Sequence, residues 1–442
     1  MPTPCSPDPA ARGRARRAAG ARPSWALALA LIAAAAARAP ASPRVTIPDT
    51  AEARQLLAGM IFAPISTAAR AAPRTVVQPS DGRPVLFRTE SSNGSVYHTF
   101  TRGDLGDARL DSAGTFIVKR RRADGTFVQA KFFLQDDPGC FARITPQGDR
   151  TALEITLFGR IFQRGVILPA RFETLLTAPL ERIMRLAGPA VEWDLLQPAE
   201  RTGADAEVER TAAAIRRALP RLAYRDDGAM DAAGRMVLIR DGSPQAGSPG
   251  FNCSGFAKWV VDGYVAPLAE GRLTDIAALK ERDLGIRGNR WTGPLEESRD
   301  PYFGLDWSRH LARELARVRS DGAGGAETWD VRDAPGFAYV DDVGYPVADL
   351  QTVLFRLARA APGCIYLGSV NRPAPGDPSL RRHDHLVVLL PYVDGGRVFR
   401  AAVFESAAEG SIESLVKRYP SDFIHLVSFD ARGDFDLPDQ VK

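Results

Sequence analysis

The amino-acid sequence predicts an α+β protein in which an antiparallel β domain precedes a second domain of mixed helices and strands. Three observations support this prediction. Short β-type runs separated by turn residues fill residues 75–168, helical apolar spacing begins at residue 205, and strand patterns return between residues 365 and 429. The length of 442 residues suffices for two or three domains, and the composition, 45% hydrophobic and 25% charged, is that of a globular protein.

The first 41 residues have the three parts of a signal peptide for export. A basic segment from Arg12 to Arg22 is followed by an apolar run of thirteen residues from Trp25 to Ala37, and then by the small-residue site at 39–41. A membrane-spanning helix needs about 20 residues. We therefore expect cleavage, no stable membrane span after it, and a periplasmic, extracellular or cell-envelope location. An uncleaved N-terminal anchor is the alternative.

The basic character of the chain belongs to this leader. The formal net charge of +4 includes +5 from residues 1–41, so the remaining residues carry a net charge of −1. Proteins that bind nucleic acid through its phosphates usually present a strongly basic surface. We therefore expect no nucleic-acid partner.

Composition shifts predict the domain boundaries. Residues 42–74, rich in Pro and Ala, are expected to form a linker with a short helix at 51–60. The β domain is expected at 75–200, closed by a helix at 172–186, and the second domain at 201–442. Further elements are predicted as strands at 84–88, 95–100, 114–119, 126–134, 153–158 and 165–168, helices at 205–219, 305–318 and 347–360, and strands at 365–367, 385–390, 398–405 and 423–429.

Cys253 is the first candidate for a reactive group. Outside the leader the chain has three cysteines, Cys140, Cys253 and Cys364, so at least one thiol is free unless chains pair with each other; a Cys140–Cys364 bridge is possible. A loop rich in Gly, Ser and Pro places Cys253 in the first turn of a predicted helix. Backbone N–H groups and the helix dipole favour a thiolate there, which is the nucleophilic form. The alternative is a small buried side chain without a chemical role.

A thiolate nucleophile needs a base, and His385 is the best-placed histidine. It opens the apolar run Leu386–Leu390, and a hairpin turn follows at residues 394–396. A hairpin centred on residue 395 would place His385 opposite Glu405, whose carboxylate could orient the imidazole. A two-residue turn at 395–396 would place it opposite Ser406 instead. Glu405 at a solvated strand end is the alternative without function.

Two other chemistries use the same residues. His383 and His385 alternate along a predicted strand, so both rings would lie on one face and could bind a metal together with Asp384 or Glu405. A thiol, an imidazole and a carboxylate also suit an acyltransferase or a transglutaminase, which share the acyl-thioester step with a hydrolase. The sequence does not show which acceptor would attack that thioester.

Three segments resemble the NlpC-type papain-like cell-wall cysteine peptidases. They are the run from Asn252 to Phe256, Pro362–Leu367, and His385 with the apolar residues after it. The resemblance implies a papain-like α+β fold that hydrolyses amide bonds in the stem peptides of peptidoglycan. Departures are Asn252 where the family usually has Asp, a Glu as third catalytic member, and a long spacing attributed to an insertion at about 266–345.

The resemblance also implies roles for individual residues. Cys253 would be the nucleophile, His385 the base and Glu405 the orienting residue, with Tyr224 and Ser254 at the substrate. No metal and no organic cofactor would be required, and peptidoglycan peptides would be the partner. The insertion, which contains Trp291 and Trp307, would form a cleft wall, a lid or additional packing helices. The non-enzymatic alternative is an envelope-binding protein with a degenerate papain-like domain.

Overall fold

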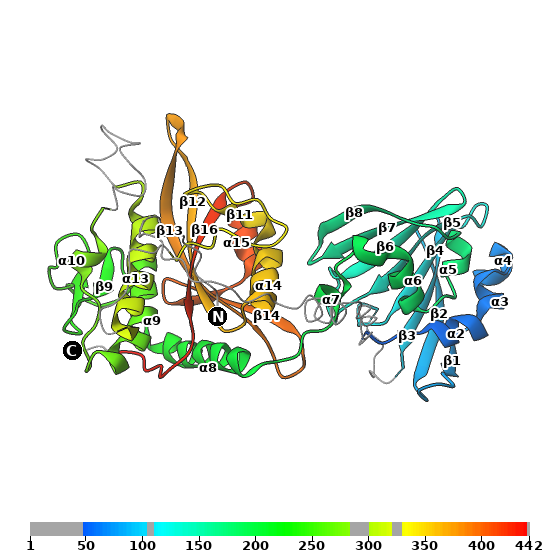
Figure 1. Ribbon diagram of the computed structural model, residues 1–442, viewed down its shortest axis with the longest axis horizontal. Coiled ribbons are helices and arrows are strands. Elements are labelled where there is room, and N and C mark those ends of the chain that lie inside the picture. Colours follow the sequence, from blue (N-terminus) through cyan, green and yellow to red (C-terminus); the bar gives the residue numbers. More distant parts are fainter. Residues whose placement is uncertain (1–46, 104–109, 283–299, 321–328, 440–442) are drawn as a thin grey trace, which may run out of the picture. The chain divides into compact units, whose positions relative to one another are not determined.

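The computed structural model describes residues 47–103, 110–282, 300–320 and 329–439, and it has α+β structure with antiparallel sheets (Figure 1). One sheet has eight strands, a second has six, and a third has two. This confirms the predicted fold class at the level of secondary structure and pairing. The predicted signal peptide at 1–41 and Trp291 lie outside the described residues. None of the described helices is long and apolar enough to cross a membrane.

The eight-stranded sheet is an antiparallel meander in which each strand pairs with the next along the chain. A hairpin turn at Asp124-Gly125 joins the fourth and fifth strands, and Gly125 there has a positive φ of 76°. The strands are β1 Arg74–Val77, β2 Pro84–Ser92, β3 Ser95–Arg102, β4 Phe116–Arg121, β5 Phe127–Phe133, β6 Phe141–Gln147, β7 Arg150–Leu157 and β8 Arg160–Leu168.

One face of this sheet carries the apolar core, because alternate side chains of a strand point to the same face. Buried aromatic rings, among them Phe87, Phe100 and Phe116, pack there against short helices. The helices are α2 Ala51–Leu56, α3 Ala58–Ile61, α4 Ile65–Ala68, α5 Phe172–Leu175, α6 Leu180–Ala187, the 3₁₀ turn Gly188–Ala190 and α7 Trp193–Leu196.

Two helical segments differ from the sequence-based expectations. Residues 42–74 were expected to form a linker, but their described part packs into the core through Ala53 and Ile61, and the Arg54 guanidinium is buried over the Phe116 ring, 4.1 Å from its centroid. The burial was not predicted because the alanine-rich composition of this segment suggested a linker. The helix expected at 172–186 is two helices, because Pro179 cannot donate a helical hydrogen bond and becomes the N-cap residue of α6.

The six-stranded sheet has the strand order β11-β16-β12-β13-β14-β15 and is antiparallel throughout. Chain neighbours β12, β13, β14 and β15 form consecutive hairpins, and β16 returns to the other side of β12. The bounds are β11 Tyr345–Pro346, β12 Cys364–Ala374, β13 Asp377–Val393, β14 Phe399–Glu405, β15 Ala408–Gly410 and β16 Phe423–Asp430.

Helices cover both faces of the six-stranded sheet. Leu386 and Val388 of β13 belong to the apolar cluster with α8, α9 and α13, whereas Val387 and Leu389 belong to the cluster with α14 and α15. Figure 1 shows these helices beside the strands. Their bounds are α8 Gly203–Ala218, α9 Cys253–Leu268, α13 Phe303–Arg319, α14 Leu350–Ala360 and α15 Ile412–Arg418, with 3₁₀ turns at Leu219–Arg221 and Val347–Asp349.

The part of the predicted insertion that the structure describes contributes to this core. Trp307 of α13 is fully buried, and its indole N–H donates to the carbonyl oxygen of Ser254 at 3.0 Å. Of the roles left open for the insertion (cleft wall, lid or packing helix), α13 therefore has the packing role. The remaining small elements are the paired strands β9 Gly228–Met230 and β10 Met236–Leu238, and the single turn α10 Ile276–Leu279.

Candidate active site

Cys253 is the first residue of helix α9, as its sequence context predicts. The side chain of Asn252 caps the helix by accepting a hydrogen bond from the Gly255 N–H at 2.8 Å. The first helical bond runs from Phe256 N–H to the Asn252 carbonyl at 2.9 Å. The N–H groups of Cys253 and Ser254 thus lie at the positive end of the helix, ahead of its internal hydrogen bonds.

Two glycines hold this helix end against strand β9. The Asn252 N–H donates to the Gly228 carbonyl oxygen at 3.0 Å. A Cβ atom on Gly255 would lie 2.0 Å from the same oxygen, so no larger residue fits at position 255 without moving the backbone. The loop before the helix is also held in place, by a parallel β-bridge between Phe251 and Tyr224. These contacts fix the backbone that carries the Cys253 sulfur.

His385 lies beside the other two predicted members of the site. Its Nε2 atom lies 2.5 Å from Glu405 Oε2, which leaves Nδ1 as the ring nitrogen for Cys253, whose thiol and the imidazole shift each other's pKa. The Tyr419 ring stacks on the imidazole with 5.9 Å between centroids and 26° between planes. The structure therefore brings Cys253, His385 and Glu405 together from a helix and two strands.

The strand register that achieves this differs from both predicted registers. Val388 pairs with Phe404 and Val393 with Phe399, which displaces β14 by two residues from the hairpin centred on 395. A two-residue displacement keeps every side chain on its face. Glu405 is consequently a diagonal neighbour of His385. It ends β14 immediately before the tight turn Ser406–Ala407, whose φ angles are 47° and 67°.

The contacts of the site favour a thiolate and an imidazolium. Burial alone raises the pKa of Cys253, but hydrogen bonding and charge interaction with His385, together with the Leu386 N–H, outweigh burial and lower it. Burial lowers the pKa of His385, yet the partners Cys253 and Glu405 raise it to about 9. An ion pair is the nucleophilic form of a cysteine site.

Arg418, at the end of α15, is a functional candidate that the sequence analysis missed. Its guanidinium donates to Glu405 Oε1, while Glu405 Oε2 contacts His385. Burial raises the pKa of Glu405, but His385 and Arg418 outweigh it and lower that pKa. Both oxygens of the carboxylate are thereby held by cations. Arg418 is a positioning residue, because it acts on the imidazole through Glu405.

We expect Arg418→Gln to move the acid limb of Cys253 alkylation to higher pH by less than about one unit, since an exposed ion pair contributes little. The Arg418 side chain is 44% exposed. Without it, Glu405 becomes protonated at a higher pH, and its charge interaction with the His385 imidazolium is lost. Alkylation rates measured between pH 4 and 8 check this. Arg418→Lys should restore the original limb; an unchanged limb in Arg418→Gln would assign Arg418 a purely structural role.

The two predicted substrate contacts have different surroundings. Tyr224 is 64% exposed and lies beside Phe251 in the loop that leads to Cys253. Ser254 is buried, and its hydroxyl oxygen lies 4.0 Å from the Cys253 sulfur. The Ser254 hydroxyl therefore acts on the sulfur, where it helps to lower the thiol pKa. Only Tyr224 of this pair presents its side chain to solvent.

His383 and His385 do not share a face, contrary to the metal-pair prediction. His385 pairs with Val370 and His383 with Asn371, so a β-bulge at Asp384 interrupts the alternation. His383 is buried, with Nδ1 3.2 Å from the Ser369 hydroxyl and its ring stacked on Tyr302. Within the described ranges, no group of three or more His, Cys, Asp or Glu residues could hold a metal ion.

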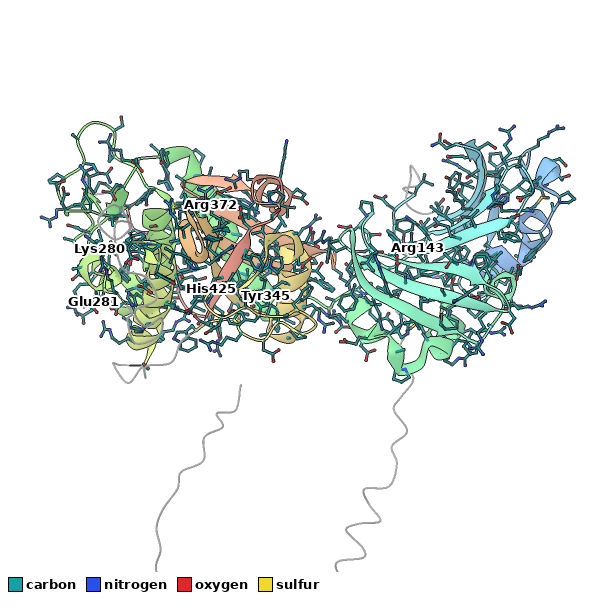
Figure 2. All side chains as sticks on the ribbon, turned by 90° about the horizontal axis from the view of Figure 1, so that it is seen from above. Arg143, Lys280, Glu281, Tyr345, Arg372 and His425 are labelled. Carbon is teal, nitrogen blue, oxygen red and sulfur yellow. The ribbon has the colours of Figure 1, made fainter. Side chains whose placement is uncertain are left out.

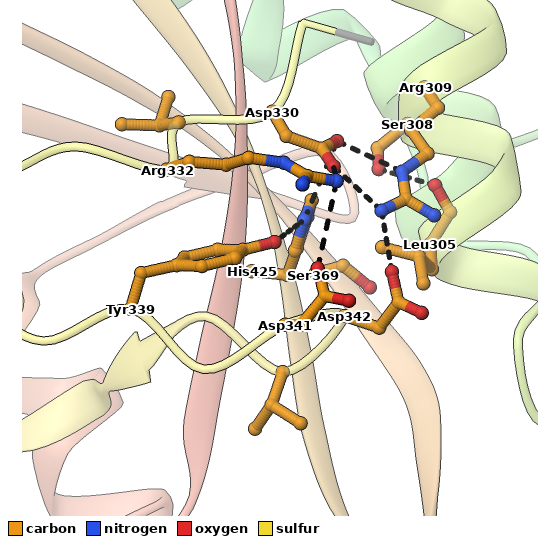
Figure 3. A network of polar contacts seen from close by, with 12 residues as sticks. Leu305, Ser308, Arg309, Asp330, Arg332, Tyr339, Asp341, Asp342, Ser369 and His425 are labelled. Atoms are coloured by element: carbon orange, nitrogen blue, oxygen red, sulfur yellow. Dashed lines mark hydrogen bonds and ion pairs between the residues drawn. The ribbon is translucent and has the colours of Figure 1, made fainter. Parts of the chain in front are cut away.

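A buried polar network lies near His383 and is centred on Arg309 of α13 (Figure 3). Arg309 donates to Asp330 at 2.9 and 2.7 Å and to Asp342 at 2.8 Å. His425 Nε2 lies 3.1 Å from the Tyr339 hydroxyl and 3.5 Å from Asp330. Burial lowers the pKa of His425, so this imidazole is neutral. The network joins α13 to β16 and the segment before β11, and has a structural role.

All three cysteines described are free, so the possible Cys140–Cys364 bridge is not formed. Burial raises the pKa of the Cys140 thiol, and burial together with the Asp430 carboxylate raises that of Cys364. Cys253 alone among the three has a lowered pKa. The difference arises from the His385 imidazole, the Leu386 N–H and the Ser254 hydroxyl around its sulfur.

Comparison with known proteins informs the first sheet but not this site. A family described as "Domain of unknown function (DUF8515)" matches residues 43–195, which include the eight-stranded sheet, the helices α2–α6 and all of α7 except its last residue. No curated protein and no solved structure matches the chain. The matched segment is less than half of the chain and ends before Cys253.

Proposed function

We propose that the chain is an exported papain-like cysteine hydrolase that cleaves amide bonds in the stem peptides of peptidoglycan. The observation that carries the proposal is the position of one imidazole, that of His385, which contacts the Glu405 carboxylate and is close enough to the Cys253 thiol that each shifts the pKa of the other. A helix start that bears the nucleophile, beside a sheet that bears the base, is the arrangement expected of the papain-like fold. The apolar leader and the resemblance to cell-wall peptidases support the location and the substrate.

The proposed reaction proceeds through an acyl-enzyme. The Cys253 thiolate attacks the carbonyl carbon, a C–S bond forms, and the N–H groups of Cys253 and Ser254 stabilise the oxyanion. The C–N bond breaks as the His385 imidazolium gives its proton to the leaving amine. Water then attacks the thioester carbon and gives one proton to His385; a C–O bond forms and the C–S bond breaks, which releases a carboxylic acid and regenerates the thiolate–imidazolium pair. No step requires a metal or an organic cofactor.

Glu405 and Tyr224 have distinct roles in this proposal. Glu405 stabilises the charged ring and selects the tautomer in which Nδ1 faces the sulfur. A carboxylate is suited to this role here because Arg418 offsets its charge. Tyr224, exposed beside the loop that leads to the nucleophile, would contact the peptide substrate.

The deciding experiment is mass analysis of purified peptidoglycan after incubation with the wild-type chain or with Cys253→Ala. We expect new stem-peptide fragments from the wild-type chain only, one bearing the new carboxylate and the other the new amine of each cleaved bond, since Cys253→Ala removes the nucleophile. Products in which an added amine replaces the leaving group would assign an acyltransferase. Identical digests from both chains would contradict catalysis at Cys253 and favour the non-enzymatic envelope-binding protein.

A further inference from the structure

The eight-stranded sheet has a second face, opposite its apolar core, that is rich in cations. Cross-strand neighbours on this face follow the row Thr99, Ile117, Lys131, Arg143 and Glu154 from β3 to β7. Figure 2 shows Arg143 on this sheet. We call the half-buried cations Lys119, Lys131 and Arg143 the cationic face.

The arrangement of these charges opposes folding. Lys131 of β5 and Arg143 of β6 are direct cross-strand partners, and like charges in that position are destabilising. Arg143 is offset by Glu154 on its other side. Among the described residues, no carboxylate lies within ion-pair distance of Lys131 or Lys119. Burial, and then the charges of Arg143 and Lys119, lower the pKa of Lys131.

Aromatic rings hold both lysines on this face. Lys131 Nζ lies 3.8 Å from the centroid of the Phe141 ring, and Lys119 Nζ lies 5.6 Å from that of Tyr97. Such contacts confine an ammonium group but leave its N–H donors unused by any anion. The cationic face is therefore a preformed set of donors whose mutual repulsion an anionic ligand would relieve.

We propose that the cationic face binds the free carboxylates of peptidoglycan stem peptides and so holds the substrate polymer on the enzyme. This inference rests on the proposed function, which supplies a polymer with many carboxylates. Arg143 already pairs with the carboxylate of its cross-strand neighbour Glu154, so a cation of this face does bind a carboxylate. Lys131 would supply the second cation of the ligand site, and Lys119 the third.

The test is co-sedimentation of full-length Cys253→Ala, which cannot turn over substrate, with purified peptidoglycan sacculi. We expect Lys131→Gln to weaken binding about tenfold, because charge-assisted hydrogen bonds to the ligand are lost. Lys119→Gln should weaken it in the same direction. Binding of Cys253→Ala to sacculi should weaken as salt is added. It should also weaken when the carboxylates of the sacculi are converted to N-methylamides.

Arg182→Gln is the matched control, because Arg182 is an exposed cation of α6 in the same domain. It removes the same charge and should leave binding unchanged. Lys131→Gln also relieves repulsion, so its melting temperature should equal or exceed that of the parent, which separates lost binding from lost folding. Equal binding by Lys131→Gln and the parent, or by native and methylamidated sacculi, would overturn the inference.

Failure of the proposed function gives a different pattern. If the wild-type chain cleaves no stem peptide while Cys253→Ala still binds sacculi through Lys131, the cationic face binds peptidoglycan but the chain is not a hydrolase. If the wild-type chain cleaves stem peptides, Lys131→Gln added to Cys253→Ala binds sacculi as well as Cys253→Ala, and Lys131→Gln alone cleaves as well as the wild-type chain, then the hydrolase stands and the cationic face has no part in holding substrate.

Discussion

At pH 7, iodoacetamide should alkylate Cys253 at least about a hundred times faster than Cys140 or Cys364, because only the thiolate reacts. The pKa of Cys253 is lowered by its partners, whereas burial raises the pKa of the other two thiols. A time course followed by mass spectrometry of the cysteine peptides measures all three rates in one sample. Equal rates would contradict an activated thiolate and favour the non-catalytic protein.

The raised pKa of His385 predicts that both stability and turnover decrease at alkaline pH. The pKa of His385 in the folded protein, about 9, exceeds its ordinary value of 6.5. The stabilisation of the folded state by imidazolium is therefore complete below pH 6.5 and is lost as the pH rises through about 9. Turnover should fall over the same range as the leaving amine loses its proton donor. Activity that keeps rising above pH 9.5 would show that His385 is not the acid.

His385→Ala should decrease alkylation of Cys253 at pH 7 about a hundredfold and turnover by about 10³–10⁴, the range for losing a general base that also activates a nucleophile. Without the imidazole, burial becomes the dominant influence on the thiol and raises its pKa. Alkylation kinetics and the peptidoglycan digest measure the two effects independently.

His383→Gln is the matched control for this prediction. His383 lies only two residues away but faces Ser369 and Tyr302 rather than the sulfur. Its replacement should leave the alkylation rate of Cys253 unchanged, whatever its effect on melting temperature. If His383→Gln and His385→Ala slowed alkylation equally, the loss would report general damage to β13 and not the removal of a base.

The three members of the candidate site could be predicted from local chemistry. Cys253 follows a helix-starting loop, His385 opens an apolar run, and Glu405 ends the next one. The predicted register was wrong by two residues, but the side chains of a strand alternate with a period of two, so Glu405 stayed on the correct face. An error of one residue would have placed the carboxylate on the other face.

The rest could not be predicted, because it depends on contacts between distant segments or on backbone irregularity. Arg418 reaches Glu405 only once α15 packs on the sheet. The bulge at Asp384, which separates His383 from His385, has no signature in the amino-acid pattern. Strand β6 was missed because a half-buried Arg143 and an exposed Pro146 interrupt its apolar alternation.

The close approach of Gly255 to the carbonyl of Gly228 has a consequence for how such an enzyme would work. Because the backbone that carries the sulfur is already held in place, the sulfur needs little reorganisation when substrate arrives. The free energy needed to position it is therefore part of folding and not of each turnover. Discrimination among peptides would then reside in side chains that line the approach, such as the exposed ring of Tyr224, because the backbone that carries the nucleophile is held in place by packing.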